Sequence, residues 1–261
     1  MKRFTFLILM VLAMVPFIFI GGCSRLSSKS TAELLGEGLK LATAGKWEKA
    51  HKYAKAAVRR EPNSQYTQLF FAFTSEHNQN KAQALTAAEN AVEFAPNNFI
   101  AQYTLGRLYN EQNKVQDAVK PLLEAYKLNP SDPYNILLMA EVYRKMNVSK
   151  DAIDYYNQLI RNHPSFMADK ENAAWVWNQL AVIYAESNNI RYAASCLKQA
   201  YTLAPENPQV LLNFAIFLDR IKRGDRAVAY YQKYLELTTK NQALMAKHEL
   251  IKQRIAVFAS R

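Results

Sequence analysis

The residues of this chain that could do chemistry are few, and they do not gather. Its histidines are scattered without the spacing of metal ligands, and we expect them on the surface or at helix ends. They are His51, His77, His163 and His248. The sequence has no glycine-rich phosphate loop, no His-Glu-x-x-His and no Cys-x-x-Cys, and no two carboxylates stand out as an acid–base pair. It therefore predicts no catalytic residue, no metal site and no cofactor.

One cysteine has a suggestive context. The chain begins MKRFTFLILMVLAMVPFIFIGGCSR, in which two basic residues precede an apolar run from Phe4 to Ile20. This order is that of an export signal, and the sequence IGGC that ends at Cys23 resembles a bacterial lipobox. In that class of signals the cysteine thiol receives a diacylglycerol and becomes the first residue after cleavage. The resemblance makes residues 1–22 a signal peptide, Cys23 the lipidation site and 23–30 a short polar tether.

An uncleaved membrane anchor is the alternative for the apolar run, although about 20 residues are usual for a spanning helix. Both alternatives place the rest of the chain outside the cytoplasm. Several acyl chains on Cys23 would hold it firmly, where a single chain would be marginal. Ser24 is not the aspartate that retains some lipoproteins in the inner membrane. In a Gram-negative cell we therefore expect the outer membrane, facing the periplasm.

Composition and charge favour a helical protein with a substantial core. Half of the 261 residues are hydrophobic and only seven are glycine, which suits helices throughout. The formal charge of +11 comes from scattered basic residues, so we expect a solvated basic surface that favours acidic partners or anionic lipid only non-specifically. With Cys23 acylated, Cys196 has no disulfide partner, and we expect it to fill space on a helix.

Three series of residues share a spacing of 34, with one longer step of 41 before the fifth repeat. The first is Gly38, Ala72, Gly106, Ala140, Ala181 and Ala215. The second is Ala50, Ala84, Ala118, Ala152, Ala193 and Ala227. The third is Pro62, Pro96, Pro130, Pro164 and Pro205. A shared period of this length indicates a repeat array.

The repeat resembles the tetratricopeptide family, as residues 99–132 illustrate. A first helix there carries Leu105-Gly106 and Tyr109, a second carries Ala118, and Pro130 closes the repeat. The resemblance implies an all-α fold: a right-handed superhelical solenoid of about six helix-turn-helix repeats with a C-terminal capping helix. The expected repeats are 31–64, 65–98, 99–132, 133–166, 174–207 and 208–241, with an insertion at 167–173 and a cap at 242–261.

Two features of the array need an explanation. Gly106 should cost its helix roughly 1 kcal/mol relative to alanine, and we expect it to permit a close approach of two backbones. The insertion either lengthens a turn or the start of a helix, or forms a projection that a partner could recognise.

The family also implies a binding surface, because its first helices line a concave groove that receives an extended peptide or a partner helix. The inward offsets correspond here to Tyr66, Leu69, Phe73, Ile100, Tyr103, Arg107, Tyr134, Leu137, Glu141, Trp175, Asn178, Val182, Leu212 and Ile216. The same offsets also give the polar residues Glu76, Asn110, Arg144, Gln209 and Asp219. Members that clamp a C-terminal carboxylate carry Lys, Arg and Asn at these offsets; that cluster is missing here, so carboxylate clamping is not expected.

An aromatic stripe should run along this groove from four successive repeats: Tyr66, Tyr103, Tyr134 and Trp175. An exposed apolar stripe usually marks a binding surface, although these rings could instead pack against one another.

The sequence thus predicts a membrane-anchored, non-catalytic scaffold that binds another envelope protein through its groove. A lipobox followed by six repeats also resembles the pilotin-type lipoproteins of type IV pilus and secretin assembly, so a secretin or pilus-assembly component is one candidate partner. An enzyme would need a clustered polar site, and RNA binding on helical repeats is disfavoured by export. Neither a nucleic acid nor a small-molecule substrate is expected.

Overall fold

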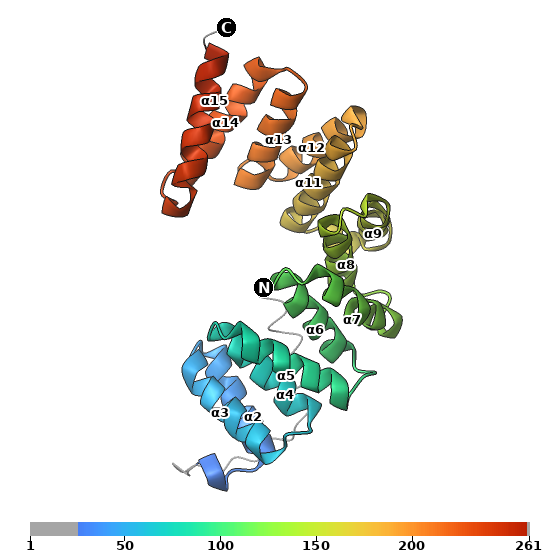
Figure 1. Cartoon of the computed structure of the whole chain (residues 1–261), viewed down its shortest axis with the longest axis vertical. Coiled ribbons are helices and arrows are strands. Elements are labelled where there is room, and N and C mark those ends of the chain that lie inside the picture. The colour runs from blue at the N-terminus through green and yellow to red at the C-terminus, as the bar shows by residue number, and fades with distance from the viewer. Residues whose placement is uncertain (1–25, 260–261) are drawn as a thin grey trace. The chain divides into compact units, whose positions relative to one another are not determined.

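A computed structural model describes residues 26–259, so Cys23 and the signal segment lie outside the described residues. Within them are fourteen α-helices, two short 3-10 helices and no strand (Figure 1). The chain divides into two compact units at Met146/Asn147, each described here by itself. The N-terminal unit contains η1 (Leu26–Ser28), α2 (Thr31–Thr43), α3 (Trp47–Arg60), α4 (Gln65–His77), α5 (Lys81–Phe94), α6 (Phe99–Glu111), α7 (Val115–Leu128) and α8 (Pro133–Lys145).

The C-terminal unit is also entirely helical. It contains α9 (Ser149–Asn162), α10 (Pro164–Met167), α11 (Lys170–Glu186), α12 (Ile190–Leu203), α13 (Pro208–Arg220), α14 (Gly224–Thr238), η2 (Gln242–Leu244) and α15 (Met245–Ala259). The predicted all-helical repeat fold is confirmed, with α15 following the last helix pair. The division between the units falls in the turn that joins the two helices of the expected fourth repeat, 133–166.

The first and second helices of each repeat are joined by one left-handed residue. Their φ angles lie between 57° and 71°, and these residues keep the spacing of 34, with one step of 41. They are Gly45, Gln79, Asn113, Asn147, Asn188 and Lys222. In the first repeat the next N–H, that of Lys46, closes the turn by donating to the Leu41 carbonyl at 2.8 Å. Glycine and asparagine suit this conformation, while Gln79 and Lys222 adopt it at a cost.

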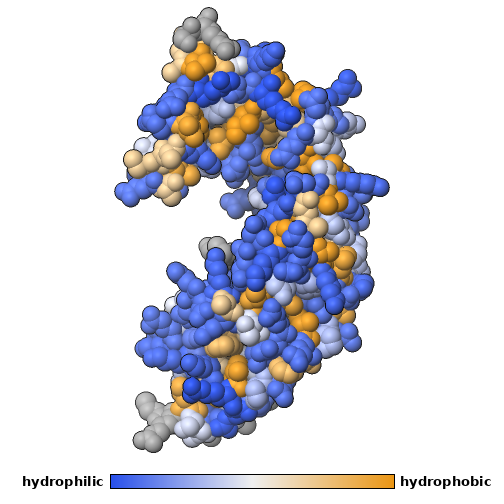
Figure 2. All heavy atoms as spheres, viewed as in Figure 1, coloured by the Kyte–Doolittle hydropathy of each residue, from blue (hydrophilic) through white to orange (hydrophobic). Residues whose placement is uncertain are grey.

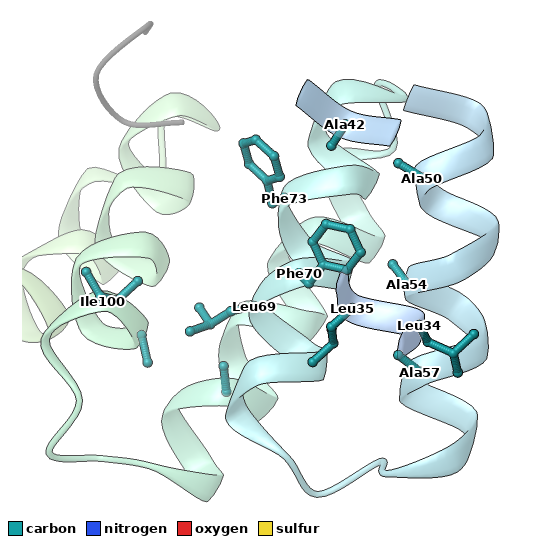
Figure 3. Close-up of a cluster of buried hydrophobic side chains, with 12 residues drawn as sticks. Leu34, Leu35, Ala42, Ala50, Ala54, Ala57, Leu69, Phe70, Phe73 and Ile100 are labelled. Atoms are coloured by element: carbon teal, nitrogen blue, oxygen red, sulfur yellow. The ribbon is translucent and has the colours of Figure 1, made fainter. Parts of the chain in front are cut away.

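Small residues hold the two helices of a repeat together. All six members of the alanine series that begins at Ala50 are completely buried. In the first repeat Ala50, Ala54 and Ala57 lie in a row on α3 and face Phe70 of α4 (Figure 3). Because an alanine side chain is only a methyl group, the large rings and leucines of the neighbouring helices fill the space between the backbones.

Gly106 on α6 shows how close this approach is. A Cβ at this position would lie 2.5 Å from both Cγ and Cδ2 of Leu122 on α7, and 3.3 Å from the backbone nitrogen of Leu122. Leu122 is itself completely buried, so its side chain has little room to move. The expectation that this glycine serves helix packing is confirmed.

The expected polar tether is packed on the first repeat, at least from Leu26 onward. Leu26 packs against the N-terminal core, and the Arg60 guanidinium donates to the Ser27 carbonyl at 2.8 Å. Lys29 is 6% exposed and its Nζ lies 2.7 Å from Glu37 Oε1. An apolar side chain and a shielded ion pair therefore hold residues that composition alone suggested would stand off from the domain.

The insertion is helical. Residues 164–167 form the single turn of α10, and α11 begins at Lys170, capped by the Asp169 carboxylate. Phe166 of α10 is 5% exposed, so the short helix packs into the C-terminal unit. Of the two alternatives considered from the sequence, the structure favours a lengthened helix start over a projection.

Replacing Gly106 by alanine should destabilise the protein by about 1–3 kcal/mol. The overpacking against Leu122 outweighs the roughly 1 kcal/mol that alanine gains in a helix. Urea unfolding measures the change. The control Gln116→Ala, on the exposed side of α7, should stay within about 0.5 kcal/mol. A more stable Gly106→Ala variant would show that the close approach is not tight.

The left-handed turn gives a second pair of variants with opposite signs. Lys222→Gly should stabilise by about 0.5–1 kcal/mol, because glycine adopts φ near 62° without the Cβ penalty. Gly45→Ala should destabilise by about 1–2 kcal/mol, since a Cβ there meets nothing within 4 Å and only the backbone strain acts. Thermal unfolding of both variants tests the assignment, which fails if the two shifts share a sign.

Candidate protein-binding groove

The groove residues predicted from the sequence lie on the first helices of the repeats. In the N-terminal unit α4 touches α6 and α6 touches α8, and in the C-terminal unit α11 touches α13. On each helix the candidates recur at steps of three or four residues, which places them on one face. The structure thus gives two stretches of first-helix surface, one in each unit.

The exposure of the candidates differs widely. Tyr66 on α4 and Ile216 on α13 are the most exposed, at 43% and 50%. Partly exposed are Arg107, Tyr134, Leu137, Glu141, Trp175 and Val182. Buried are Leu69, Phe73, Ile100, Tyr103, Asn178 and Leu212. The candidates therefore comprise an exposed or partly exposed set, largely apolar, and a buried set that belongs to the core of each unit.

The expectation of a continuous exposed aromatic stripe is wrong at Tyr103. Its side chain is only 6% exposed and stacks on Phe99 of the same helix, with ring centroids 5.8 Å apart. Burial raises the pKa of its phenol well above the usual range, so the ring stays neutral. Tyr103 supports the groove floor, and the surface candidates among the four aromatic residues are Tyr66, Tyr134 and Trp175.

An ion-pair cluster joins α4 to α6 on this face. The two terminal nitrogens of Arg107 bind the two carboxylate oxygens of Glu76 at 2.8 and 2.6 Å, and Nη1 also lies 2.6 Å from Glu111 Oε1. The Arg107 side chain is 12% exposed. Burial alone would lower the pKa of its guanidinium, but the two glutamates outweigh burial and raise it. The charge of Arg107 is therefore already paired with two carboxylates of its own chain.

A second polar contact joins α6 to α8. Lys145 Nζ lies 2.7 Å from the side-chain oxygen of Asn110 and 3.6 Å from Glu141 Oε1. Both Lys145 and Glu141 are about one quarter exposed, so this pair lies closer to solvent than Arg107. The two contacts fix the relative positions of three consecutive first helices.

The C-terminal unit has an amide chain at the equivalent place. Gln209 Nε2 donates to Asn213 Oδ1 at 2.9 Å, and Asn213 Nδ2 donates to Asn178 Oδ1 at 3.1 Å. Asn178 is 1% exposed, and its own amide nitrogen has no hydrogen-bond partner among residues 26–259. The Asn178 nitrogen is itself shielded from solvent, so this amide chain joins α11 to α13 inside the unit and presents no donor at the surface.

The last repeat is closed by the cap helix. Arg254 of α15 binds the Asp219 carboxylate of α13 through Nε at 2.7 Å and Nη2 at 2.5 Å. The pKa of Tyr231 is raised to about 12, first by burial and then by the neighbouring Asp219. Asp219, one of the polar candidate positions, is therefore already bound by the cap. Its two-point ion pair with Arg254 is of the same kind as the pair between Glu76 and Arg107.

Cys196 on α12 is a buried free thiol. Burial raises the pKa of the Cys196 thiol to about 11, which keeps it protonated at neutral pH. The part of the chain that the structure describes contains no cluster of residues suited to a metal ion, and no helix in it has the length and apolarity needed to cross a membrane.

Three of the four histidines make defined side-chain contacts within the fold. His51 shares a hydrogen bond with Thr74, and His77 stacks on Trp47 at 3.7 Å between ring centroids. The expectation of a surface or helix-end position is wrong for His248, which is 8% exposed and lies 2.8 Å from the Thr238 hydroxyl. The hydroxyl of Thr238 provides a polar partner inside the cap that sequence spacing did not indicate.

The expectation that basic residues are evenly scattered is also wrong, because α3 concentrates them. It carries five basic residues and one glutamate, a net formal charge of +4. The other second helices carry between −1 and +2. Lys49, Lys52, Lys55 and Arg59 recur every three or four residues and all are exposed. That spacing was a signal available in the sequence.

Taken together, the stacked helix pairs define a helical-repeat protein. Family models described as Tetratricopeptide repeat match residues 77–133 and 178–241, and a second such model matches 134–165. These segments make up more than half of the chain, which therefore belongs to the tetratricopeptide repeat family.

Individual relatives are distant. The chain is 22% identical over 197 residues to anaphase-promoting complex subunit CDC16 of Saccharomyces cerevisiae, covering 76% of this chain and 24% of that protein. It thus spans about a quarter of that curated relative.

Among solved structures, that of Pseudomonas aeruginosa pilF aligns with a TM-score of 0.66 and 16% identity, over 90% of this chain and 99% of that one. YrrB, titled a TPR protein with an unusual peptide-binding site, aligns with a TM-score of 0.55 and 16% identity, over 74% and 97%. Identities this low show a shared fold alone.

The ion pair between Arg107 and Glu76 should be worth more than an exposed pair. A double-mutant cycle with Arg107→Ala and Glu76→Ala should give a coupling free energy of about 1–3 kcal/mol, because the guanidinium is largely shielded from water. The matched cycle on the exposed pair Lys127–Glu124 should stay below about 1 kcal/mol. Equal couplings, measured by urea unfolding, would contradict a role for Arg107 in fixing the groove helices.

Proposed function

We propose that the protein is a non-catalytic scaffold of the bacterial cell envelope that binds another protein along its first-helix face. The observation that carries this proposal is the apolar surface that the first helices leave exposed. Tyr66 on α4 is 43% exposed and Ile216 on α13 is 50% exposed. Exposed apolar side chains on packed helices suit the side chains of an extended peptide or of a partner helix.

The remaining groove chemistry supports a protein ligand over a small molecule. Tyr66, Leu137 and Val182 add apolar surface, while the charged groups of Arg107 and Glu76 already bind each other. On the face that it draws, Figure 2 shows separate hydrophobic areas on a largely hydrophilic surface, which suits several side-chain contacts. The peptide-binding site described for YrrB is consistent with this use of the fold.

The location of the protein follows from the N-terminal segment, which lies outside the described residues. The apolar run and the lipobox-like sequence before Cys23 support export and lipid attachment, with the outer membrane facing the periplasm as the expected place in a Gram-negative cell. Anchoring at Cys23 would keep the groove near the membrane surface, where a membrane-embedded partner could be held.

A second candidate is a pilotin-type role in type IV pilus or secretin assembly. It is favoured by the combination of a lipobox-like signal with six repeats, and by the similarity of fold along nearly the whole of P. aeruginosa pilF. On this proposal the groove ligand is a secretin or another component of pilus assembly.

Crosslinked purification from native cells tests both candidates. Three baits are compared: the unmodified chain, a groove variant and a control variant. The groove variant carries Tyr66→Glu and Ile216→Glu, which place charge on exposed candidate positions in each unit. The matched control carries Leu128→Glu and Tyr192→Glu, at positions 42% and 58% exposed on second helices. One envelope protein should co-purify with the unmodified chain and the control, and fall about tenfold or more with the groove variant, as for the loss of a hot spot of about 2 kcal/mol.

The outcome separates the possibilities clearly, provided that all three baits have the same melting temperature. A secretin or pilus component among the lost proteins supports the pilotin role, and another envelope protein supports the general scaffold. Equal recovery with all baits would show that the first-helix face is not the binding site.

A further inference from the structure

The basic face of α3 lies close to the place where the chain would meet a membrane. Leu26 is three residues after Cys23, so their Cα atoms are at most about 11 Å apart. Leu26 packs on the first repeat, and Ser27 accepts a hydrogen bond from Arg60 at the end of α3. A chain anchored at Cys23 therefore cannot carry α3 far from the lipid.

The exposed face of α3 has the chemistry to bind anionic headgroups. Lys49, Lys52, Lys55 and Arg59 project from one side of the helix, and the single acidic residue among them is Glu48. The opposite side is buried through Ala50, Ala54 and Ala57 (Figure 3), so the helix cannot turn its charges inward. None of these four basic residues is used in an ion pair that fixes the fold, in contrast to Lys29 and Arg107.

We propose that the exposed basic face of α3 binds the anionic phospholipid surface beside the anchor and orients the N-terminal unit on the membrane. The proposal rests on membrane attachment at or before Cys23, which is part of the proposed function. Each lysine or arginine near an anionic surface contributes a factor of about five in affinity. The anchor supplies proximity, and α3 determines which side of the unit faces the lipid.

The occupant of this face is lipid rather than the protein ligand of the groove. The basic face belongs to a second helix, whereas the groove candidates lie on first helices. Binding lipid through α3 therefore leaves Tyr66 on α4 available for a protein. The local charge, +4 on one helix, also exceeds that of every other second helix in the described chain.

The test uses the full chain, purified from membranes with its anchor and inserted into lipid nanodiscs. One set of discs is phosphatidylcholine alone, and the other has equal parts of phosphatidylcholine and phosphatidylglycerol. Lysine acetylation is followed residue by residue by mass spectrometry. Lys49, Lys52 and Lys55 should react about fivefold more slowly on the anionic discs, and Lys198 and Lys247 equally on both.

Salt and two variants identify the cause. Molar salt should restore the reactivity of the three lysines, because it screens charges beyond about 3 Å. Lys52→Gln, Lys55→Gln and Arg59→Gln together should make Lys49 equally reactive on both discs. The control variant removes the same charge from exposed positions of the C-terminal unit and should keep the protection of α3: Arg191→Gln, Lys198→Gln and Lys247→Gln.

Insertion into the phosphatidylcholine discs tests the membrane anchor alone, because these discs carry no net charge for α3 to bind. A chain that inserts but shows equal lysine reactivity on both discs overturns the proposal while leaving the anchor intact, and an acidic protein partner then becomes the occupant that the face fits. Equal loss of protection in both variants also overturns it, because net charge and not the α3 face would be responsible. A chain that does not insert at all contradicts the membrane attachment on which both proposals depend.

Discussion

The close approach of paired helices at small residues is the constraint on which the rest of the structure depends. A helix of 13 or 14 residues is marginal alone in water, so each must be stabilised by its neighbours. The fully buried alanine in the first turn of each second helix, and small residues on the first helices such as Gly106, let the backbones come near enough for large side chains from adjacent helices to fill the remaining space. Because the same small residues recur in each repeat, the same arrangement of two packed helices recurs with them.

Because the pairs repeat, consecutive first helices meet in nearly the same way. Polar side chains at similar positions therefore form hydrogen bonds or ion pairs from one first helix to the next. Glu76–Arg107, Asn110–Lys145 and Asn178–Asn213 each join neighbouring first helices over 31 or 35 residues, and Asp219–Arg254 joins the last first helix to the cap. These contacts pair polar and charged side chains within the chain, while apolar side chains such as Tyr66 and Ile216 stay exposed. The surface is thus better suited to an extended peptide than to an anion.

At the start of the described chain, packing and one ion pair hold the backbone in place, while most of the basic side chains stay exposed. Leu26 and the Lys29–Glu37 pair fix residues that would otherwise form a free linker, and Arg60 holds the same segment by a backbone carbonyl. The remaining basic residues of α3 point to solvent. On the proposed attachment at Cys23, the short distance between the anchor and the first repeat would make this charged helix face an orienting surface, which a long linker would not do.

The sequence by itself determined the helical repeat, because its period of 34 appears in residue types whose size or backbone geometry is indispensable. Gly106, the alanine series and the closing prolines are of this kind. The first-helix face could also be located, since helical periodicity places its members together.

Which of these side chains reach solvent was decided only by the tertiary structure. Tyr66 and Ile100 occupy equivalent offsets, 34 residues apart, yet Ile100 is buried and Tyr66 is exposed, because exposure depends on the side chains of neighbouring helices. The left-handed turns at Gln79 and Lys222 and the buried His248–Thr238 contact likewise follow from tertiary packing that overrides local preference.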